Sequence, residues 1–381
     1  MTSLSQLDTP AAIVDVARMH ANIQRMRTRM NELGVRFRPH VKTSKCLPVV
    51  RAQWTAGAQG VTVSTLKEAE QFFAAGISDI LYAVGMTPAK LPKVLALRRQ
   101  GCQLKIIVDD PAVADAIATF GKTHGEVFEV WIEVDCDGHR SGIHPDDKDR
   151  LVDVARRLTG GGMLLGGVMT HAGSSYDLDT PEALEALAGQ ERAGCVQAAE
   201  HIRATGIACP GVSVGSTPTA LRARNLVGVT EVRAGVYVFF DLVMHNIGVC
   251  RMDEIALSVL TTVIGHQVDK GWAIVDAGWM AMSRDRGTAK QRKDFGYGQV
   301  CAVDGTVLPG YLVSGANQEH GIISCENGPG GPDTQIGTRF PVGTQLRIIP
   351  NHACATGAQF PEYHALNGDG STEIWPRFYG W

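Results

Sequence analysis

Short apolar runs alternate with helical patterns through residues 35–240 of the chain. Each run has the length and β-branched content of one strand, and a segment with the helical spacing of apolar positions follows most of them. The predicted strands are Val35–Pro39, Gly60–Ser64, Ile80–Val84, Leu104–Val108, Glu129–Asp135, Leu164–Thr170, Gly211–Gly215 and Glu231–Phe239. The helices predicted between them include Leu66–Ala75, Pro88–Arg99, Pro111–His124, Pro145–Leu158 and Pro181–Thr205.

Eight strand–helix steps within about 200 residues have the count and spacing of a (β/α)8 barrel of the TIM type. A doubly wound parallel sheet is the alternative, because it is built from the same strand–helix unit. Proline at the start of several predicted helices fits the first helical turn, where the missing N–H costs nothing. Glycine after several of them fits a left-handed C-cap.

After about residue 250 the helical periodicity disappears and alternating or β-branched runs replace it. These runs are Ala256–Ile264, Trp272–Asp276, Val307–Val313, Gln345–Ile349 and Thr372–Trp375. They predict an antiparallel β domain. We therefore expect a barrel over residues 24–248, a β domain over residues 249–381, and an N-terminal segment, residues 1–23, that joins the β domain. The run Gly328–Gly331 is expected to be an exposed loop.

Composition excludes several classes of partner. The 381 residues carry a net charge of only -3, and lysine and arginine are dispersed, which argues against a nucleic-acid partner. No apolar run approaches the roughly 20 residues that span a bilayer, and the N-terminus has no basic leader followed by an apolar core. The 9 cysteines form no CxxC pair, which indicates reduced thiols and a cytoplasmic protein.

Reactive and polar residues gather where the predicted barrel strands end. In a barrel enzyme the loops at that face carry the chemistry. The residues are Lys42 after the first strand, Arg140 after the fifth, His171 and Tyr176 after the sixth, Ser216 and Thr217 after the seventh, and Gly235 and Tyr237 within the eighth.

Lys42 is a candidate Schiff-base nucleophile, because a lysine at a strand end can lose its charge when it is partly desolvated. Gly215-Ser216-Thr217 at a strand–helix junction offers backbone N–H groups and two hydroxyls to an anion, although an ordinary N-cap has the same sequence. Gly235 and Tyr237 are positioned to complete a phosphate site. A phosphate site opposite a strand-end lysine is what pyridoxal phosphate (PLP) requires.

A second candidate pair is His352-Ala-Cys354. In an extended segment these side chains point to the same side, so imidazole and thiolate can bind one cation. Two ligands are too few for a closed structural zinc site, and an open site completed by water and substrate fits better. A packed thiol beside a surface imidazole is the alternative. The nearby Arg284-Asp285-Arg286 is expected to be an exposed charged loop.

With these motifs the chain resembles the fold-type III PLP enzymes related to alanine racemase, and within them the D-serine dehydratase and D-threonine aldolase family. The resemblance covers nearly the whole chain. The matching segments are Arg38-Pro-His-Val-Lys42, Thr170-His171-Ala-Gly, Gly215-Ser-Thr, Arg233-Ala-Gly235-Val-Tyr237, Gln318-Glu-His320-Gly and Pro350-Asn-His352-Ala-Cys354.

The resemblance implies a role for each candidate residue. Lys42 carries PLP, Arg140 lies by its phenolic oxygen, His171 lies beside the ring, and Tyr176 reaches the pyridine nitrogen. The phosphate is held by Ser216, Thr217, Gly235 and Tyr237. A divalent metal, zinc or manganese with magnesium as a further option, binds His352 and Cys354. The resemblance also implies a homodimer.

The implied activity is a dehydratase, that is an ammonia-lyase, of a small D-3-hydroxy amino acid. D-threo-3-hydroxyaspartate would give oxaloacetate and ammonia, and D-serine would give pyruvate. Within the family, aldolases tend to carry His-x-Asp where this chain has His352 and Cys354. The alternatives are an aldolase that cleaves such substrates to glycine and an aldehyde, and a non-catalytic PLP-binding protein. The sequence does not identify the β-substituent or the residue that binds a distal carboxylate.

Overall fold

The computed structural model describes residues 2–326 and 333–381, so the predicted loop Gly328–Gly331 lies outside the described residues. The chain divides into two compact units. One comprises Arg25–Gly235 with Phe378–Trp381, and the other comprises Met1–Gln24 with Val236–Arg377. By this division the second unit begins at Val236, directly after the last barrel strand.

Eight parallel strands form the sheet of the first unit, in the order β3-β10-β9-β8-β7-β6-β5-β4. Their bounds are β3 (Arg36–Pro39), β4 (Val61–Val63), β5 (Asp79–Gly85), β6 (Gln103–Val108), β7 (Glu129–Val134), β8 (Leu164–Thr170), β9 (Gly211–Val214) and β10 (Glu231–Ala234). A parallel bridge between His40 and Thr62 joins the two outermost strands and closes the sheet. The (β/α)8 barrel is therefore confirmed, and the doubly wound alternative is excluded.

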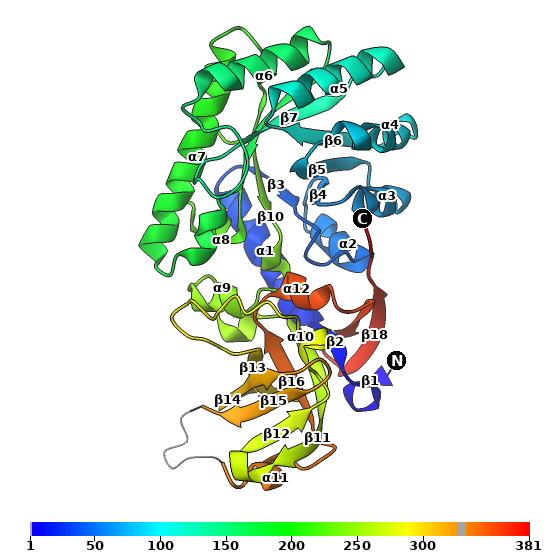
Figure 1. Cartoon of the computed structure of the whole chain (residues 1–381), viewed down its shortest axis with the longest axis vertical. Coiled ribbons are helices and arrows are strands. Elements are labelled where there is room, and N and C mark those ends of the chain that lie inside the picture. Colours follow the sequence, from blue (N-terminus) through cyan, green and yellow to red (C-terminus); the bar gives the residue numbers. More distant parts are fainter. Residues whose placement is uncertain (1, 327–332) are drawn as a thin grey trace. The chain divides into compact units, whose positions relative to one another are not determined.

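Helices follow the strands along the chain and lie outside them (Figure 1). Helix α1 (Val16–Glu32) precedes β3, and the others are α2 (Leu47–Thr55), α3 (Leu66–Ala74), α4 (Leu91–Arg99), α5 (Pro111–His124), α6 (Lys148–Gly160), α7 (Pro181–Arg203) and α8 (Thr217–Arg222). None of the helices in the described residues combines the length and the apolar character needed to cross a membrane.

Local signals explain where these helices begin. The Asp110 side chain accepts hydrogen bonds from the N–H groups of Ala112 and Val113, and Pro111 occupies the first turn of α5. Helix α6 begins at Lys148 rather than at the predicted Pro145, because Asp147 is its cap. The predicted strand Glu231–Phe239 was too long, since the chain turns into the short 3-10 helix η4 (Val236–Val238) after β10.

Apolar side chains fill the middle of the barrel. Leu81, Ile107, Trp131 and Met169, from four adjacent strands, form one buried cluster. Trp131 is the largest side chain of this cluster, and a Cβ atom on Gly211 would lie 2.2 Å from its ring. Alternation along the strands places these side chains on the same face as the charged residues that precede them.

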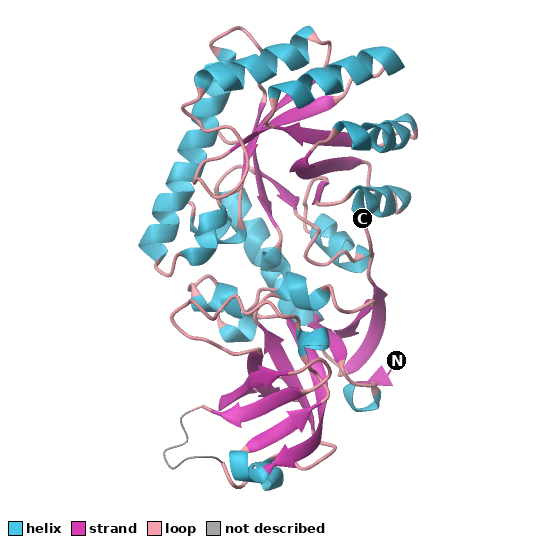
Figure 2. Cartoon of the chain, in the orientation of Figure 1, coloured by secondary structure: helices cyan, strands magenta, loops and turns pink. Residues whose placement is uncertain are grey.

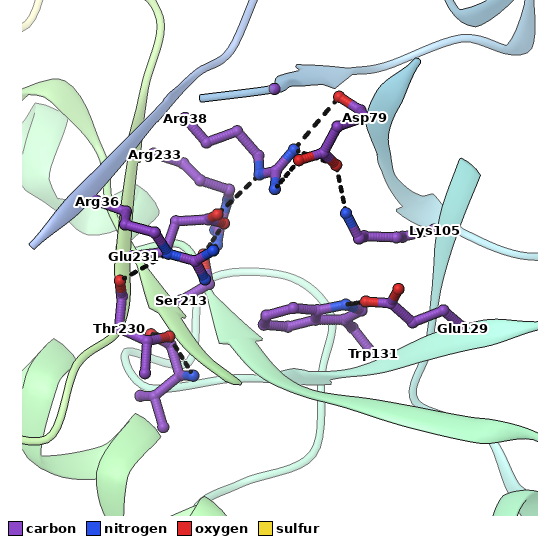
Figure 3. A network of polar contacts seen from close by, with 12 residues as sticks. Arg36, Arg38, Asp79, Lys105, Glu129, Trp131, Ser213, Thr230, Glu231 and Arg233 are labelled. Atoms are coloured by element: carbon purple, nitrogen blue, oxygen red, sulfur yellow. Dashed lines mark hydrogen bonds and ion pairs between the residues drawn. The ribbon is translucent and has the colours of Figure 1, made fainter. Parts of the chain in front are cut away.

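A charged network occupies the barrel interior where the strands begin (Figure 3). Arg38 donates to Glu231 at 2.8 Å and forms a two-bond ion pair with Asp79 at 2.9 and 3.0 Å. Lys105 binds the same Asp79 carboxylate. Because Asp79 and Glu231 begin β5 and β10, which are not neighbours in the sheet, Arg38 connects strands across the barrel. Buried charges of this kind are tolerated only when they are paired and hydrogen-bonded.

The second unit contains a 10-stranded sheet, which is largely antiparallel as predicted (Figure 2). The predicted runs correspond to β11 (Leu257–Gln267), β12 (Trp272–Val275), β14 (Val307–Ala316), β16 (Gln345–Pro350) and β18 (Ser371–Pro376). The sequence pattern missed the short strands β1 (Thr2–Ser3), β2 (Ala11–Asp15), β13 (Gly298–Ala302), β15 (Gly321–Cys325) and β17 (Glu362–Leu366). Strand β2 lies between β11 and β17, so the N-terminal segment is part of this sheet.

Candidate active site

Lys42 lies in the turn that connects β3 to α2. The N–H of Val41 binds the carbonyl of Thr62 at 2.9 Å, and the N–H of Lys45 binds the carbonyl of Val41 at 2.8 Å. The first bond ties the turn to β4, and the second closes the turn itself. The Lys42 side chain is exposed, so the structure places it at the predicted strand end without the partial burial that the sequence argument assumed.

Two histidines near Lys42 are held neutral. His171 follows β8, and its Nδ1 lies 2.8 Å from the carbonyl oxygen of Gly215. Burial, together with the charges of Lys42 and Arg140, lowers the pKa of His171 to about 3. Burial and the same two cations also hold the pKa of His40 well below its usual range. Both imidazoles are therefore uncharged at neutral pH.

The charges around these two histidines favour an anion. Lys42, Arg140 and Arg233 all act on both histidines, so three cations lie close together at this end of the barrel. The buried Nδ1 of His40 has no hydrogen-bond partner among the described residues. A buried polar atom left without a partner is costly, and a bound ligand removes that cost. An anionic cofactor such as PLP fits these residues.

Arg140 and Tyr176 lie in the loops after β7 and β8. Arg140 is exposed, and its charge reaches both His40 and His171. Tyr176 belongs to the 3-10 helix η3 (Gly173–Asp177), and its ring centroid lies 6.2 Å from that of His171. The structure thus brings Arg140, His171 and Tyr176 to the same part of the barrel as Lys42.

Ser216 and Thr217 lie at the start of α8 and are buried. The Ser216 hydroxyl accepts a hydrogen bond from the N–H of Thr219, so Ser216 is an ordinary N-cap residue of α8. Its hydroxyl also lies 2.9 Å from that of Ser175, which connects the loops after β8 and β9. Gly215 has φ 138, and a Cβ atom there would lie 2.0 Å from the carbonyl oxygen of Arg233.

Gly235 follows β10 beside the turn that carries Lys42. A Cβ atom on Gly235 would lie 2.9 Å from the carbonyl oxygen of His40 and 3.0 Å from the hydroxyl of Thr43. This close approach is a reason for glycine that does not depend on a phosphate. Tyr237 lies two residues further on, in η4, and is buried.

The sequence analysis missed Glu191, which is buried in the middle of α7. Its Oε1 accepts hydrogen bonds from the N–H groups of Ala172 at 3.1 Å and Gly215 at 3.0 Å. Burial raises the pKa of this carboxyl group, although the hydrogen bonds oppose the shift. Glu191 therefore holds the loops that carry His171 and Ser216. The sequence signal that could have revealed Glu191 is an acidic residue within the apolar face of a long predicted helix.

In the second unit, the structure corrects the expected geometry of His352 and Cys354. Strand β16 ends at Pro350, and Cys354 lies in the short helix α12 (Ala353–Gly357), with His352 as its N-cap residue. The two side chains nevertheless meet. Although burial acts in the opposite direction, the charge and hydrogen bond of Cys354, with a hydrogen bond to Asp285, raise the pKa of His352 to about 11.

This donor set suits a divalent cation. Imidazole and thiolate are ligands of zinc and other transition metals, and a bound cation would take the place of the proton that His352 holds. Within residues 2–326 and 333–381, no group of three His, Cys, Asp or Glu residues could hold a metal ion. A cation held by His352 and Cys354 would therefore have only these two ligands from the described residues, with positions left for water or substrate.

Two further acidic residues support this pair and were not predicted to do so. His352 Nδ1 lies 2.6 Å from Asp285 Oδ2, so Asp285 is more than part of an exposed charged loop. Asp241 is buried and accepts hydrogen bonds from the N–H groups of Ala353 at 2.9 Å and Met244 at 3.0 Å. Burial raises the pKa of Asp241. Both contacts join residues far apart in the chain, which no local pattern reveals.

A parallel barrel with a lysine after its first strand and a largely antiparallel β unit define the class of alanine racemase-like enzymes. Residues 14–243 match the family model "Alanine racemase, N-terminal domain", and residues 256–366 match "Putative serine dehydratase domain". The chain belongs to this family of PLP-dependent enzymes, in which it is 68% identical over 379 residues to a D-threo-3-hydroxyaspartate dehydratase from Delftia sp.. That alignment covers 100% of this chain and 99% of the relative.

Solved structures agree with this assignment. The Delftia sp. dehydratase has a TM-score of 0.98 at 67% identity, with 100% of both chains covered. Another structure of a D-threo-3-hydroxyaspartate dehydratase, with one cysteine replaced by alanine, is in the metal-free form and has the same TM-score. A D-threonine aldolase from Filomicrobium marinum has a TM-score of 0.81 at 25% identity, covering 98% of this chain and 96% of the aldolase.

Proposed function

We propose that this chain is a PLP- and metal-dependent dehydratase of D-3-hydroxy amino acids, with D-threo-3-hydroxyaspartate as its substrate and oxaloacetate and ammonia as its products. The observation that carries this proposal is the 68% identity, over the full length of the chain, to a dehydratase of that substrate. Cys354 supports it, because the resemblance associates His-x-Cys with dehydratases and His-x-Asp with aldolases.

We propose that PLP is held by the residues gathered at the barrel strand ends. Lys42 would carry it, Arg140 would lie by the phenolic oxygen, and His171 would lie beside the ring. Tyr176 would reach the pyridine nitrogen. The phosphate would be held by Ser216, Thr217, Gly235 and Tyr237. When bound, PLP supplies an electron sink for the bond that is broken at the substrate's Cα.

The chain's own side chains have separate tasks in this reaction. The amine of Lys42 would take the Cα proton of the substrate, in a role that needs its neutral form. His40 and His171 stay uncharged because burial holds their pKa values low. They can therefore hydrogen-bond a ligand without adding positive charge. Glu191 is a positioning residue, since it binds backbone N–H groups rather than the substrate.

His352 and Cys354 would hold the divalent cation, which supplies a Lewis acid for the β-hydroxyl group. Elimination needs such help, because free hydroxide is a poor leaving group at neutral pH. The thiolate favours zinc, and manganese and magnesium are the other options to test. Loss of the Cα proton and of the hydroxyl group gives an enamine, and water hydrolyses the corresponding imine. The water lost is thus returned, and the net products are a 2-oxo acid and ammonia.

A substrate panel tests the proposal. D-threo-3-hydroxyaspartate, D-serine and D-threonine are offered to the PLP-loaded enzyme with a divalent metal, and oxo acid, ammonia, glycine and aldehyde are all measured. Oxaloacetate and ammonia in equal amounts from D-threo-3-hydroxyaspartate are expected, with slower pyruvate release from D-serine. Glycine and an aldehyde would show an aldolase instead, and the absence of turnover with every substrate would favour a non-catalytic PLP-binding protein.

We further propose a homodimer and a cytoplasmic location. The resemblance implies the dimer, and sedimentation equilibrium of the purified protein tests it. No disulfide joins any of the cysteines in the part of the chain that the structure describes, which is consistent with a reducing compartment. Fractionation of the source cells tests the location.

A further inference from the structure

Asp285 contacts the imidazole edge of a proposed metal ligand. Its Oδ2 lies 2.6 Å from Nδ1 of His352, which is the distance of a strong, charge-assisted hydrogen bond. The residues are 67 positions apart in the chain, so tertiary structure alone brings them together. Nδ1 is the donor in this bond because an ionised carboxylate can only accept.

We propose that Asp285 is the positioning residue of the metal site: it holds the Nδ1–H form of His352 and thereby directs Nε2 toward the cation shared with Cys354. The inference rests on the proposed metal pair. Histidines that bind metals usually donate their other ring N–H to a carboxylate or carbonyl, which fixes the ring and makes the ligating nitrogen more basic.

The direction of the imidazole nitrogens excludes Asp285 as a third ligand. The two ring nitrogens point away from each other, so a carboxylate bound at Nδ1 cannot reach a cation at Nε2 of the same ring. The absence of any three-residue metal group in the described part of the chain agrees with this. Asp285 therefore acts on the metal only through His352.

The chain around Asp285 is built to hold this contact. Ser283 has φ 73, which is rare for a residue other than glycine, and its hydroxyl accepts the N–H of Asp285 at 2.9 Å. The Thr356 hydroxyl donates to the carbonyl of Met282 at 2.8 Å and ties this segment to α12. Such a backbone conformation persists only where the surrounding structure determines it.

A second tie lies on the other side of Asp285. The Thr288 hydroxyl donates to the amide oxygen of Asn351 at 2.6 Å, and the Asn351 amide donates to the carbonyl of Gly296 at 2.7 Å. Asn351 and Thr288 are both buried. The segments on both sides of Asp285 are thus bonded to the residues around His352, which fixes the distance between carboxylate and imidazole.

The contact itself contributes little to the stability of the fold. The side chains of His352 and Asp285 are 40% and 41% exposed, and exposed pairs of this kind contribute about 0–1 kcal/mol. Asp285 can therefore be changed without unfolding the protein. This makes metal affinity, rather than stability, the property to measure.

The experiment measures Mn2+ binding to the PLP-loaded enzyme by the EPR signal of free Mn2+. Asp285→Asn and Asp285→Ala should weaken Mn2+ binding about 10- to 100-fold, and the alanine variant should have the lower affinity. The absorbance of bound PLP and the unfolding temperature should stay unchanged. Asp294→Asn is the matched control, because Asp294 pairs with Arg286 in the same segment and should leave binding unchanged. Cys354→Ala should abolish binding.

The variants separate failure of this inference from failure of the proposed metal site. Parent-like binding by Cys354→Ala, or no binding by the parent, would remove the metal pair itself. If both Asp285 variants bound Mn2+ like the parent while Cys354→Ala did not bind it, only the positioning role would be overturned. If Asp285→Ala lost Mn2+ binding as completely as Cys354→Ala, Asp285 would be a metal ligand. That result would also overturn the positioning role. As a second readout, the 15N shifts of His352 in zinc-loaded protein should show the cation at Nε2 and a proton at Nδ1 in the parent, and a share of the opposite arrangement in Asp285→Ala.

Discussion

Glu191 Oε1 lies 3.0 Å from the backbone N–H of Gly215, so a carboxylate in the middle of α7 holds the loop that begins α8. The same oxygen accepts from Ala172, just after His171. Two loops of the proposed cofactor site thus depend on one buried side chain.

Removing this carboxylate should weaken PLP binding. Glu191→Ala leaves two buried N–H groups without acceptors, at a cost of about 1–3 kcal/mol each in the free energy of unfolding. Glu191→Gln keeps one acceptor oxygen and should be milder. PLP affinity, measured by the absorbance of the bound cofactor, should fall in the order parent, glutamine, alanine. Glu200→Ala, at an exposed position of the same helix, is the control and should bind PLP normally.

Parent-like PLP affinity in Glu191→Ala would show that the loops keep their positions without the carboxylate. A loss of stability without a loss of affinity would assign Glu191 to the fold alone.

Lys42 should be the residue that borohydride labels. The purified protein is expected to be yellow, and reduction should fix the cofactor on the peptide that contains Lys42. Lys45 and Lys67 are the alternatives. Lys45 pairs with the buried Glu68 at 3.2 Å, so its amine is engaged, and it serves as an internal control. Label on either of these lysines would refute the assignment, and Lys42→Ala should take up no label.

Acid should destabilise the cofactor-free protein through its neutral histidines. The pKa of His171 is lowered to about 3, whereas an unfolded histidine titrates near 6.5. Between these values the unfolded chain binds a proton that the folded chain does not, so the free energy of unfolding falls as the pH falls, by up to about 1.4 kcal/mol per pH unit. Urea unfolding between about pH 4 and pH 7 should show a shallower slope in His171→Gln than in the parent.

The exposed His144 provides the control for this experiment, since its side chain is 65% exposed. His144→Gln should leave the slope of stability against pH as it is in the parent. Equal slopes in the parent and in His171→Gln would mean that His171 takes up its proton in the folded state.

Much of the fold could be predicted from the sequence, because strands and helix starts are marked by local sequence patterns. The eight barrel strands follow from short β-branched runs, and α5 follows from its cap Asp110 and its first-turn Pro111. The end of β10 was not readable, because Val236 and Val238 have strand-like character but the chain turns at Gly235 beside the Lys42 turn. The short strands β15 and β17 are defined by pairing with longer neighbours rather than by their own composition.

The sequence predicted that Lys42 and His171 follow barrel strands, and the structure places both of them there. The residues that support the candidate site could not be predicted in this way. Asp285 and His352 are joined by a contact across 67 positions, and the sequence around Asp285 reads as an ordinary charged loop. Glu191 was detectable in principle, since it interrupts the apolar face formed by Ala188, Cys195 and other buried residues of α7.

The metal decides between elimination and retro-aldol cleavage, and chelation tests it. Treating the enzyme with a chelator should abolish ammonia release from D-threo-3-hydroxyaspartate while the absorbance of bound PLP remains, and zinc or manganese should restore activity. Cys354→Ala should behave like the chelated enzyme, because water cannot replace the charge of a thiolate. Cys325→Ala, which removes another half-buried thiol of the same unit, should remain active.

Hydroxide departure needs a Lewis acid at the β-oxygen, whereas retro-aldol cleavage needs the β-hydroxyl proton removed by a base. Metal-dependent release of glycine and an aldehyde would therefore show that the same ion serves an aldolase, and full dehydratase activity in metal-free protein would refute the role of His352 and Cys354.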